Sequence, residues 1–187
     1  MYAGHLDFGA ELVWTLDGAL PPEECDAYTA KMRERRAEAE VAPIVGHDGR
    51  PEIDLETRNN TRIMWDDEAE ANALLARVAH TVPERLSNRK LVGANPRLRL
   101  YRYEPGQKHG AHWDTVVELP GGVESLLTLV FYLNDDFEGG ATDFPELKRV
   151  IVPRRGRALL FQHRILHEAT SVLRGEKHVL RTDVLYR

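Results

Sequence analysis

The second half of this chain is divided into short apolar runs by glycine and proline, and this pattern constrains the fold most. From Pro96 onward, strand-like runs alternate with breaks that contain Gly or Pro. The runs are LRLYRYE, LLTLVFYL, ATDF, VIVP, RALLFQ and KHVLRTDVLY. Several short strands with such breaks are typical of a closed or nearly closed antiparallel β-structure. We therefore expect a mainly β fold of the α+β class, with helices packed outside it.

The first 95 residues read as mainly helical. Pro21 and Pro22 suit a first helical turn, and the acidic residues after them suit the positive end of a helix dipole. A second helix is predicted for DDEAEANALLARVAHTV, which Pro83 should end, and TRIMW before it reads as a short strand. Because the β-rich part would otherwise fold without its helices, we expect one domain over residues 1–187. Residues 1–95 form its helical support region, and residues 96–187 form its β-core.

Length and charge exclude several classes of protein. A chain of 187 residues suits one domain that buries about 70% of its unfolded surface. The net charge of −5 predicts no general attraction to nucleic acid or membranes. Cys25 is the single cysteine, which excludes an internal disulfide and fits a reducing compartment. The N-terminal residues lack the pattern of a signal peptide, and no apolar run approaches the ~20 residues of a spanning helix. We expect a cytoplasmic protein.

The clearest chemical signal is His112-Trp-Asp114, followed more than fifty residues later by His167. Two imidazoles and one carboxylate form the set of ligands that non-haem Fe(II) oxygenases use, and they leave coordination positions open. Side chains two apart on a strand share a face, so His112 and Asp114 should point the same way. Lys177, ten residues after His167, adds a cation against which an oxo-acid could dock. Alone, a His-x-Asp pair would read as an ordinary surface loop.

The wider pattern changes that reading. His-x-Asp is followed by T-x-x-x-YLN, GGxTxF, PxxGxALxF and a histidine with a basic residue ten positions later. Over residues 97–187 the chain therefore resembles the prolyl-4-hydroxylase-like branch of the 2-oxoglutarate/Fe(II)-dependent dioxygenases. The resemblance implies a double-stranded β-helix (jelly-roll, cupin-like) core with the N-terminal helices outside. It also implies Fe(II), the co-substrates 2-oxoglutarate and O₂, and ascorbate as a candidate additional cofactor.

The resemblance also implies roles for individual side chains. His112, Asp114 and His167 look like the iron ligands, and Lys177 looks like the cation that binds the distal carboxylate of 2-oxoglutarate. Three further residues resemble side chains around the co-substrate: Tyr132, Thr128 and Tyr103. Each has an ordinary structural alternative, because aromatic residues and threonine are common in buried strands.

His163 competes with His167 for the role of ligand. The run RALLFQ before it reads as a strand, and two residues four apart on an extended chain lie ~13 Å from each other, too far to share one metal. We choose His167, because only that residue has a basic residue ten positions later.

The expected reaction is hydroxylation of an unactivated C–H bond, with release of succinate and CO₂. The substrate would be peptidyl or a small amino-acid-like molecule, and nucleic acid is not expected. Two other functions stay open. One is a non-catalytic module that senses metal or 2-oxoglutarate. The other is a zinc hydrolase, for which Glu118 or Glu168 would have to act as general base.

The last strand carries a second basic residue, Arg181. We predict a hairpin that turns near Arg174-Gly175, which would put His167 opposite roughly position 182. By alternation Lys177, Arg181 and Asp183 share one face, with Lys177 and Arg181 ~13 Å apart along the strand. Lys177 would then hold the far end of the co-substrate while Arg181 lies beside the metal. There Arg181 would bind a substrate carboxylate or the near end of 2-oxoglutarate, with Asp183 accepting a substrate amine, or else the two residues would pair.

Overall fold

The computed structural model describes residues 6–46 and 49–187. These ranges contain the helices α1 (Pro22–Glu34) and α2 (Glu68–Val78) and the 3₁₀ turns η2 (Arg36–Glu38), η3 (Ala79–Thr81) and η4 (Pro145–Leu147). The strands before residue 95 are β1 (Val13–Leu16), β2 (Glu40–Val41), β3 (Ile44–Val45), β4 (Pro51–Glu52), β5 (Thr61–Asp66), β6 (Arg85–Leu86) and β7 (Arg89–Ala94). Those after it are β8 (Arg97–Tyr103), β9 (His109–His112), β10 (Glu118–Leu119), β11 (Val123–Tyr132), β12 (Glu138–Gly139), β13 (Thr142–Phe144), β14 (Arg149–Ile151), β15 (Ala158–Gln162), β16 (His167–Ala169), β17 (Val172–Arg174) and β18 (Lys177–Tyr186).

Both helices begin where the sequence provides an N-terminal signal. Pro22 opens α1, and two acidic residues follow in its first turn. At the start of α2 the side chain of Asp67 accepts a hydrogen bond from the backbone N–H of Glu70 at 2.8 Å. The buried face of α2 then packs on the sheet through Ala71, Leu74, Leu75 and Val78. No helix among the described residues is long and apolar enough to cross a membrane.

A large antiparallel sheet forms the centre of the molecule. Its strands follow the order β1-β15-β11-β18-β8-β5-β2, with β7 paired to β18. The six runs predicted as strands from Pro96 onward all lie in strands. The prediction of a mainly helical first half is wrong, because β1 and β7 belong to the large sheet together with β5, the strand that TRIMW predicted. Neither β1 nor β7 was predicted, and their strand conformation depends on pairing with β15 and β18 of the second half.

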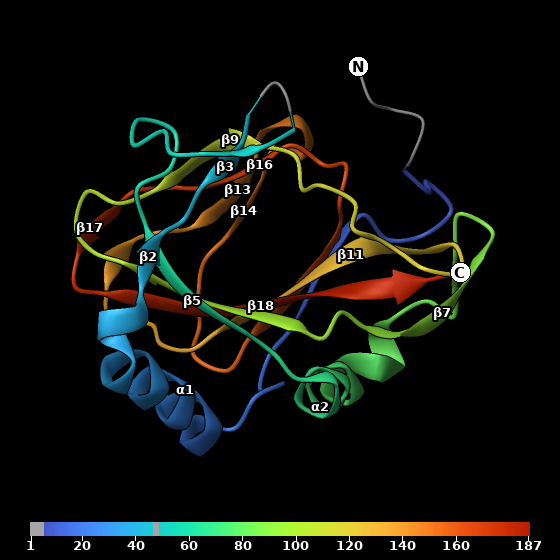
Figure 1. Ribbon diagram of the computed structural model, residues 1–187, viewed down its shortest axis with the longest axis horizontal. Helices are drawn as coiled ribbons and strands as arrows, with labels where there is room; N and C mark the ends of the chain where they lie inside the picture. Colours follow the sequence, from blue (N-terminus) through green and yellow to red (C-terminus); the bar gives the residue numbers. More distant parts are fainter. Residues whose placement is uncertain (1–5, 47–48) are drawn as a thin grey trace.

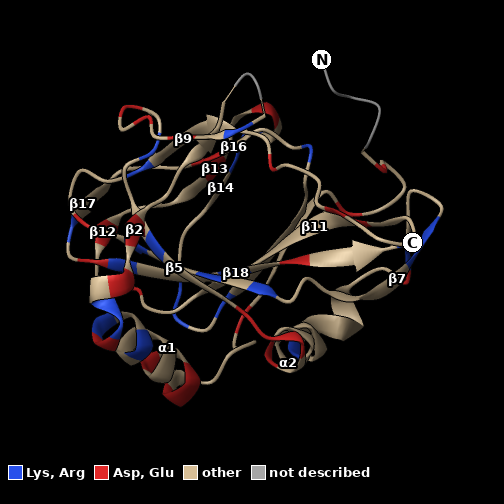
Figure 2. Ribbon diagram, viewed as in Figure 1, with Lys and Arg blue, Asp and Glu red and all other residues tan. Residues whose placement is uncertain are grey.

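A smaller sheet, in the order β14-β13-β16-β9, faces the large one. Figure 1 shows three layers: α1 and α2 cover one face of the large sheet, and the small sheet lies over its other face. Side chains of β8 point to both faces of the large sheet. Leu98 and Leu100 pack under the helices, and Tyr101 and Tyr103 point into the space between the two sheets. The two facing sheets form the predicted jelly-roll core. In Figure 2 basic positions lie along β5 and β18, within this layered interior as well as on the surface.

The predicted hairpin after His167 is wrong. Residues 172–174 pair with β12, whereas β18 pairs with β11, β8 and β7. Gly175 does turn the chain, with φ at +82°. The turn, however, carries the chain from a two-stranded sheet of β12 and β17 into the large sheet, so the strands on its two sides are not neighbours. A local turn signal does not tell a hairpin from such a crossover. The predicted alternation along β18 is correct, because Lys177, Val179 and Arg181 all line one cavity.

Candidate active site

His112, Asp114 and His167 come together at one end of the space between the sheets. A potential ligand atom of each lies within 4.8 Å of the others. The pairing of β9 with β16 brings the two histidines together, because His112 and His167 are direct cross-strand partners. Asp114 lies just beyond the end of β9, where its backbone N–H donates to the carbonyl of His163 at 3.1 Å. The two segments therefore meet through strand pairing and one backbone hydrogen bond.

The two imidazoles are oriented as metal ligands need. Nδ1 of His112 lies 2.8 Å from the carbonyl of Gly110, and Nδ1 of His167 lies 3.0 Å from the carbonyl of Ile165. A carbonyl only accepts, so each Nδ1 carries the proton and each Nε2 keeps its lone pair. Both Nε2 atoms face Asp114, each 3.7 Å from one of its oxygens. Burial lowers the pKa of His167 to about 3, so that its ring stays neutral.

Both oxygens of Asp114 are held by other side chains. Thr128 donates its hydroxyl to Oδ2 at 2.5 Å, and Arg181 donates Nη1–H to Oδ1 at 2.8 Å. Burial by itself would raise the pKa of Asp114, but its charged and hydrogen-bonding neighbours, led by the guanidinium of Arg181, hold the pKa well below its ordinary value. Two imidazoles and a carboxylate form a donor set that fits a divalent first-row metal.

Arg181 also begins a chain of buried ion pairs. It donates to Asp183 at 3.1 Å, and the other oxygen of Asp183 receives Nη1–H of Arg99 at 3.0 Å. Asn95 donates to the same carboxylate at 3.1 Å. Burial opposes ionisation here, but Arg181 and Arg99 hold the pKa of Asp183 at about 2. Asp183 is thus occupied by protein groups, so it is not open to accept a substrate amine, whereas the pairing of Arg181 with Asp183 is observed.

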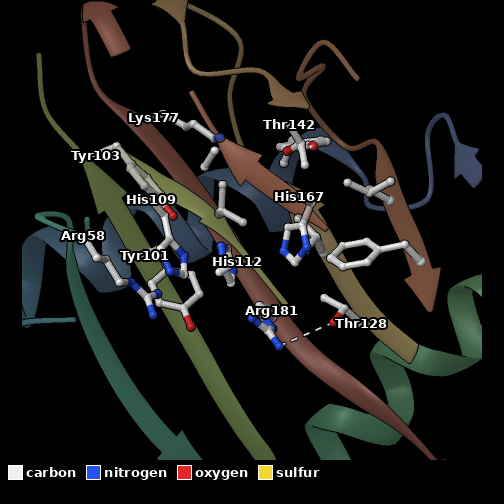
Figure 3. Close-up of a pocket in the computed structure, with 16 residues that line it drawn as sticks. Arg58, Tyr101, Tyr103, His109, His112, Thr128, Thr142, His167, Lys177 and Arg181 are labelled. Carbon is white, nitrogen blue, oxygen red and sulfur yellow. Dashed lines mark hydrogen bonds between the residues drawn. The ribbon is translucent and has the colours of Figure 1, made fainter. Parts of the chain in front are cut away.

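A pocket runs inward from the histidines and ends at Lys177. It holds about 60 Å³ of open space. Figure 3 shows Lys177 near Thr142, away from His112 and Arg181. The ammonium donates to the carbonyl of Gly140 at 2.6 Å and lies 5.0 Å from the centre of the Tyr103 ring. No carboxylate pairs with Lys177 among the described residues, and burial lowers its pKa to about 7.

A second, larger space opens on the other side of the metal-binding cluster. This outer groove has a volume of about 520 Å³. The inner pocket and the outer groove meet at His112, and Asp114 borders only the outer groove. The hairpin of β3 and β4 supplies one wall, and Trp113, 45% exposed, supplies another. The metal-binding cluster therefore lies between a small inner pocket and a larger outer groove.

The structure brings all the sequence-predicted site residues to this region. Tyr132, Thr128, Tyr103, Lys177 and Arg181 all line the inner pocket. Two of these residues also contact other protein groups. Thr128 bonds to Asp114, while the hydroxyl of Tyr132 lies 2.7 Å from that of Thr142.

His163 stays outside the metal-binding cluster, as predicted, but for a different reason. The chain after Gln162 turns instead of continuing extended, and Nε2 of His163 faces Asp183 at 3.7 Å. Neither Glu118 nor Glu168 lines the pocket or the groove, so the general base that a zinc hydrolase needs has no support here.

Four residues that surround the cluster were not predicted. The ring of His109 stacks on that of His112 at 3.5 Å, and the other three are Thr142, Tyr101 and Arg58. Alternation along β8 would have placed Tyr101 beside Tyr103, and Thr142 occupies the threonine position of GGxTxF. Arg58 carries no signal in the sequence, because its place depends on contacts far along the chain.

Comparison with known proteins agrees with this geometry. Residues 98–182 match the model of the 2OG-Fe(II) oxygenase superfamily. This part of the chain is therefore similar to 2OG-Fe(II) oxygenases. A protein of Acanthamoeba polyphaga mimivirus, provisionally named as a prolyl 4-hydroxylase, is 30% identical over 100 residues, or 44% of this chain and 41% of that protein. Prolyl 4-hydroxylase 1 of Arabidopsis thaliana is 28% identical over 185 residues, or 84% of this chain and 63% of that protein.

The fold of the whole chain is shared with solved prolyl hydroxylases. The viral collagen prolyl hydroxylase of Paramecium Bursaria Chlorella virus-1, in complex with 2OG, superposes with a TM-score of 0.65 at 22% identity, covering 95% of this chain and 97% of that one. The jelly-roll prediction and the resemblance to the prolyl-4-hydroxylase-like branch are both confirmed. An oxygenase domain of this family implies Fe(II), 2-oxoglutarate and O₂, and the His-Asp-His cluster fits the iron.

Proposed function

We propose that this chain hydroxylates an unactivated C–H bond with Fe(II), 2-oxoglutarate and O₂. One oxygen atom of O₂ would enter the substrate as a hydroxyl, and the other would enter succinate as CO₂ leaves. The observation that carries the proposal is the face formed by His112, Asp114 and His167 at the mouth of a pocket that ends at Lys177. A buried ammonium without a carboxylate partner is costly unless an anion completes it.

Within this proposal Lys177 binds the distal carboxylate of 2-oxoglutarate. Its ammonium is fully buried and is held by the carbonyl of Gly140, with the rings of Tyr103 and Tyr132 beside it at 5.0 and 5.6 Å. The Tyr132 and Thr142 hydroxyls form a hydrogen-bonded pair in the same pocket. A carboxylate placed there would gain a charge-assisted hydrogen bond from Lys177 in a site from which water is largely excluded.

The ligand residues act through their fixed orientation. Fe(II), when bound, supplies the redox chemistry that activates O₂. His112 and His167 present lone pairs because backbone carbonyls hold their Nδ1–H groups, and Asp114 stays ionised because Arg181 and Thr128 bind its oxygens. In this proposal Arg181 positions Asp114 for the metal.

The primary substrate would bind in the outer groove. Two features support a peptide or an amino-acid-like molecule: the groove is open to solvent, and its volume of about 520 Å³ exceeds that of the inner pocket. A solved structure of similar fold, described as a prolyl hydroxylase in complex with a peptide fragment of the hypoxia inducible factor oxygen degradation domain from Trichoplax adhaerens, supports a peptide in this groove (TM-score 0.68, 16% identity).

The test is a panel of peptides and amino acids incubated with Fe(II), 2-oxoglutarate and O₂. Succinate formation together with a mass increase of one oxygen atom would support the proposal. The Lys177→Met variant is the matched control, since it removes the ammonium and keeps the length of the side chain. If the purified protein binds Fe(II) but neither binds nor consumes 2-oxoglutarate with any peptide or amino acid of the panel, the proposed function is wrong.

A further inference from the structure

Arg58 is a buried cation whose partners are all neutral. Only 7% of the residue is exposed, yet it borders both the inner pocket and the outer groove. Its Nε donates to the side-chain oxygen of Asn60 and its Nη1 to the carbonyl of Pro43, each at 3.1 Å. Its guanidinium carbon lies 5.1 Å from the centre of the Tyr101 ring. Among the described residues no carboxylate lies within ion-pair distance of Arg58, so its charge is not neutralised.

The other basic side chains of the groove differ from Arg58 in this respect. Arg62 pairs with Glu40 at 2.9 Å, and Arg99 and Arg181 share the carboxylate of Asp183. Since Arg99 and Arg181 are also direct cross-strand partners, they would repel each other without that carboxylate. Each of these three guanidiniums is thus matched by an acidic group of the protein, and Arg58 is not.

Among the described residues, positive charges outnumber negative ones around the pocket and groove. Five cations of this part of the chain line the two spaces, and three carboxylates pair with them or lie among them: Arg58, Arg62, Arg99, Lys177 and Arg181 against Asp114, Asp183 and Glu40. The two charges of a divalent ion and those of the dianion 2-oxoglutarate would cancel, so an excess of two positive charges remains. A positive, partly desolvated groove favours an anionic ligand.

The position of Arg58 fits a ligand in the outer groove. Residue 58 forms a β-bridge with His109, whose ring stacks on His112. In Figure 3 Arg58 and Tyr101 lie on one side of His112, with Lys177 beyond Tyr103. Burial would raise the pKa of Tyr101, but the guanidiniums of Arg58, Arg181 and Arg99 outweigh it and lower that pKa. The phenol and the guanidinium together provide donors close to the metal-binding cluster.

We propose that Arg58 binds a carboxylate of the primary substrate, so that the substrate of this oxygenase is an acid. This inference rests on the proposed function, since it names the substrate class of the same site. The carboxylate belongs either to a small amino-acid-like molecule or to an acidic side chain next to the reacting residue of a peptide. In both cases Arg58 anchors the substrate beside the metal-binding cluster, and Lys177 is left to 2-oxoglutarate.

The experiment measures binding, with Zn(II) in place of Fe(II) and saturating 2-oxoglutarate to fill the inner pocket. Two matched pairs serve as probes: N-acetyl-L-proline against its amide, and Ac-Gly-Pro-Glu-Gly-NH₂ against the same peptide with Gln. Side-chain ¹⁵Nε signals of arginine report contact with the guanidinium. We expect the acid of at least one pair to bind about 10- to 100-fold more tightly than its neutral partner, as a charge-assisted hydrogen bond would give. The pair that responds distinguishes the two sources of the carboxylate.

Three variants assign that preference to a residue. Arg58→Gln should bring acid and neutral probe to within about twofold of each other, and Arg58→Lys should keep part of the preference. Arg62→Gln is the matched control, because Arg62 lines the same groove but already has Glu40 as its partner. It should keep the full preference.

Several results would overturn the proposal: no preference for the acid in either pair of the wild-type protein, or a preference that survives Arg58→Gln. A loss of 2-oxoglutarate affinity in Arg58→Gln as large as that in Lys177→Met would also overturn it, because Arg58 would then serve the co-substrate. A protein that binds the acids through Arg58 but never consumes 2-oxoglutarate would refute the proposed function and leave the anion subsite standing. One that consumes 2-oxoglutarate without the preference would refute the subsite alone.

Discussion

Binding of 2-oxoglutarate should draw a proton from the solvent onto Lys177. Burial lowers the pKa of this ammonium to about 7 in the unliganded protein, and a carboxylate bound against it would raise that pKa again. From these values, binding should take up about 0.1 proton at pH 6, about 0.5 at pH 7 and about 0.9 at pH 8. The affinity for 2-oxoglutarate should therefore stay level below pH 6 and fall about tenfold per pH unit above pH 7.

The same group sets a trend in the stability of the unliganded protein. The pKa of Lys177 is 10.5 when unfolded and about 7 when folded, so between these values the unfolded chain binds a proton that the folded chain does not. Stability should then rise with pH across this window, by at most about 1.4 kcal/mol per pH unit. Lys177→Met removes the buried charge, so it should abolish this contribution and stabilise the unliganded protein most at pH 7 and below.

Isothermal titration calorimetry measures the proton uptake directly. Titrations of the Zn(II)-loaded protein with 2-oxoglutarate, in buffers of different ionisation enthalpy, give the number of protons at each pH. The Lys177→Met variant is the control, and it should bind weakly with no uptake. Zero uptake by the wild-type protein at pH 8 would refute the reasoning, because Lys177 would then be charged before binding or would not contact the carboxylate.

Three further predictions follow from the site. Replacing His112, Asp114 or His167 by Ala should abolish succinate formation and weaken metal binding, while circular dichroism shows that the fold is retained. Near-normal coupled turnover in any of these variants would exclude the replaced residue as a ligand. Arg181→Ala should lower kcat about 10- to 100-fold by releasing Oδ1 of Asp114, with little change in the KM for 2-oxoglutarate; a change confined to that KM would contradict its placement at Asp114. Zn²⁺, Co²⁺ and Ni²⁺ should inhibit, and fresh Fe(II) with ascorbate should restore activity, because such ligands bind these ions at least as well as Fe(II). Turnover with Zn²⁺ in the absence of O₂ would point to hydrolysis instead.

The parts of the fold that the sequence predicted are those with strong local patterns. The runs around Leu100, Leu129 and Leu160 have closely spaced apolar or aromatic residues and a break with Gly or Pro on at least one side, and all of them form strands of the large sheet. Metal ligands could be predicted because their spacing is part of a long ordered motif. Alternation along β18 correctly put Lys177 and Arg181 on one face. The hairpin register that was used to place Arg181 beside His167 is wrong, although Arg181 does contact Asp114.

The failures share one physical cause, which is dependence on partners distant in the sequence. The partners of β18 are strands of the large sheet that lie far away in the sequence, and the turn at Gly175 does not encode this pairing. Arg58 is held by Pro43 and Asn60 and bridges to His109, contacts that no periodicity reveals. For Asp183 one of the two expectations, pairing with Arg181, is observed, but the second partner, Arg99 from a neighbouring strand, was not predicted.

The pairing of His112 with His167 gives the metal a mechanical role as well as a chemical one. These cross-strand partners close a segment that contains β11, β13 and β15, so an ion bound to both would act as a crosslink across that segment. A crosslink stabilises a fold mainly by restricting the unfolded chain, and it does so more strongly for a long loop than for a short one. Removal of the metal would therefore loosen the small sheet first, and amide hydrogens of β9 and β16 would exchange faster while those of β11 and β18 stay protected.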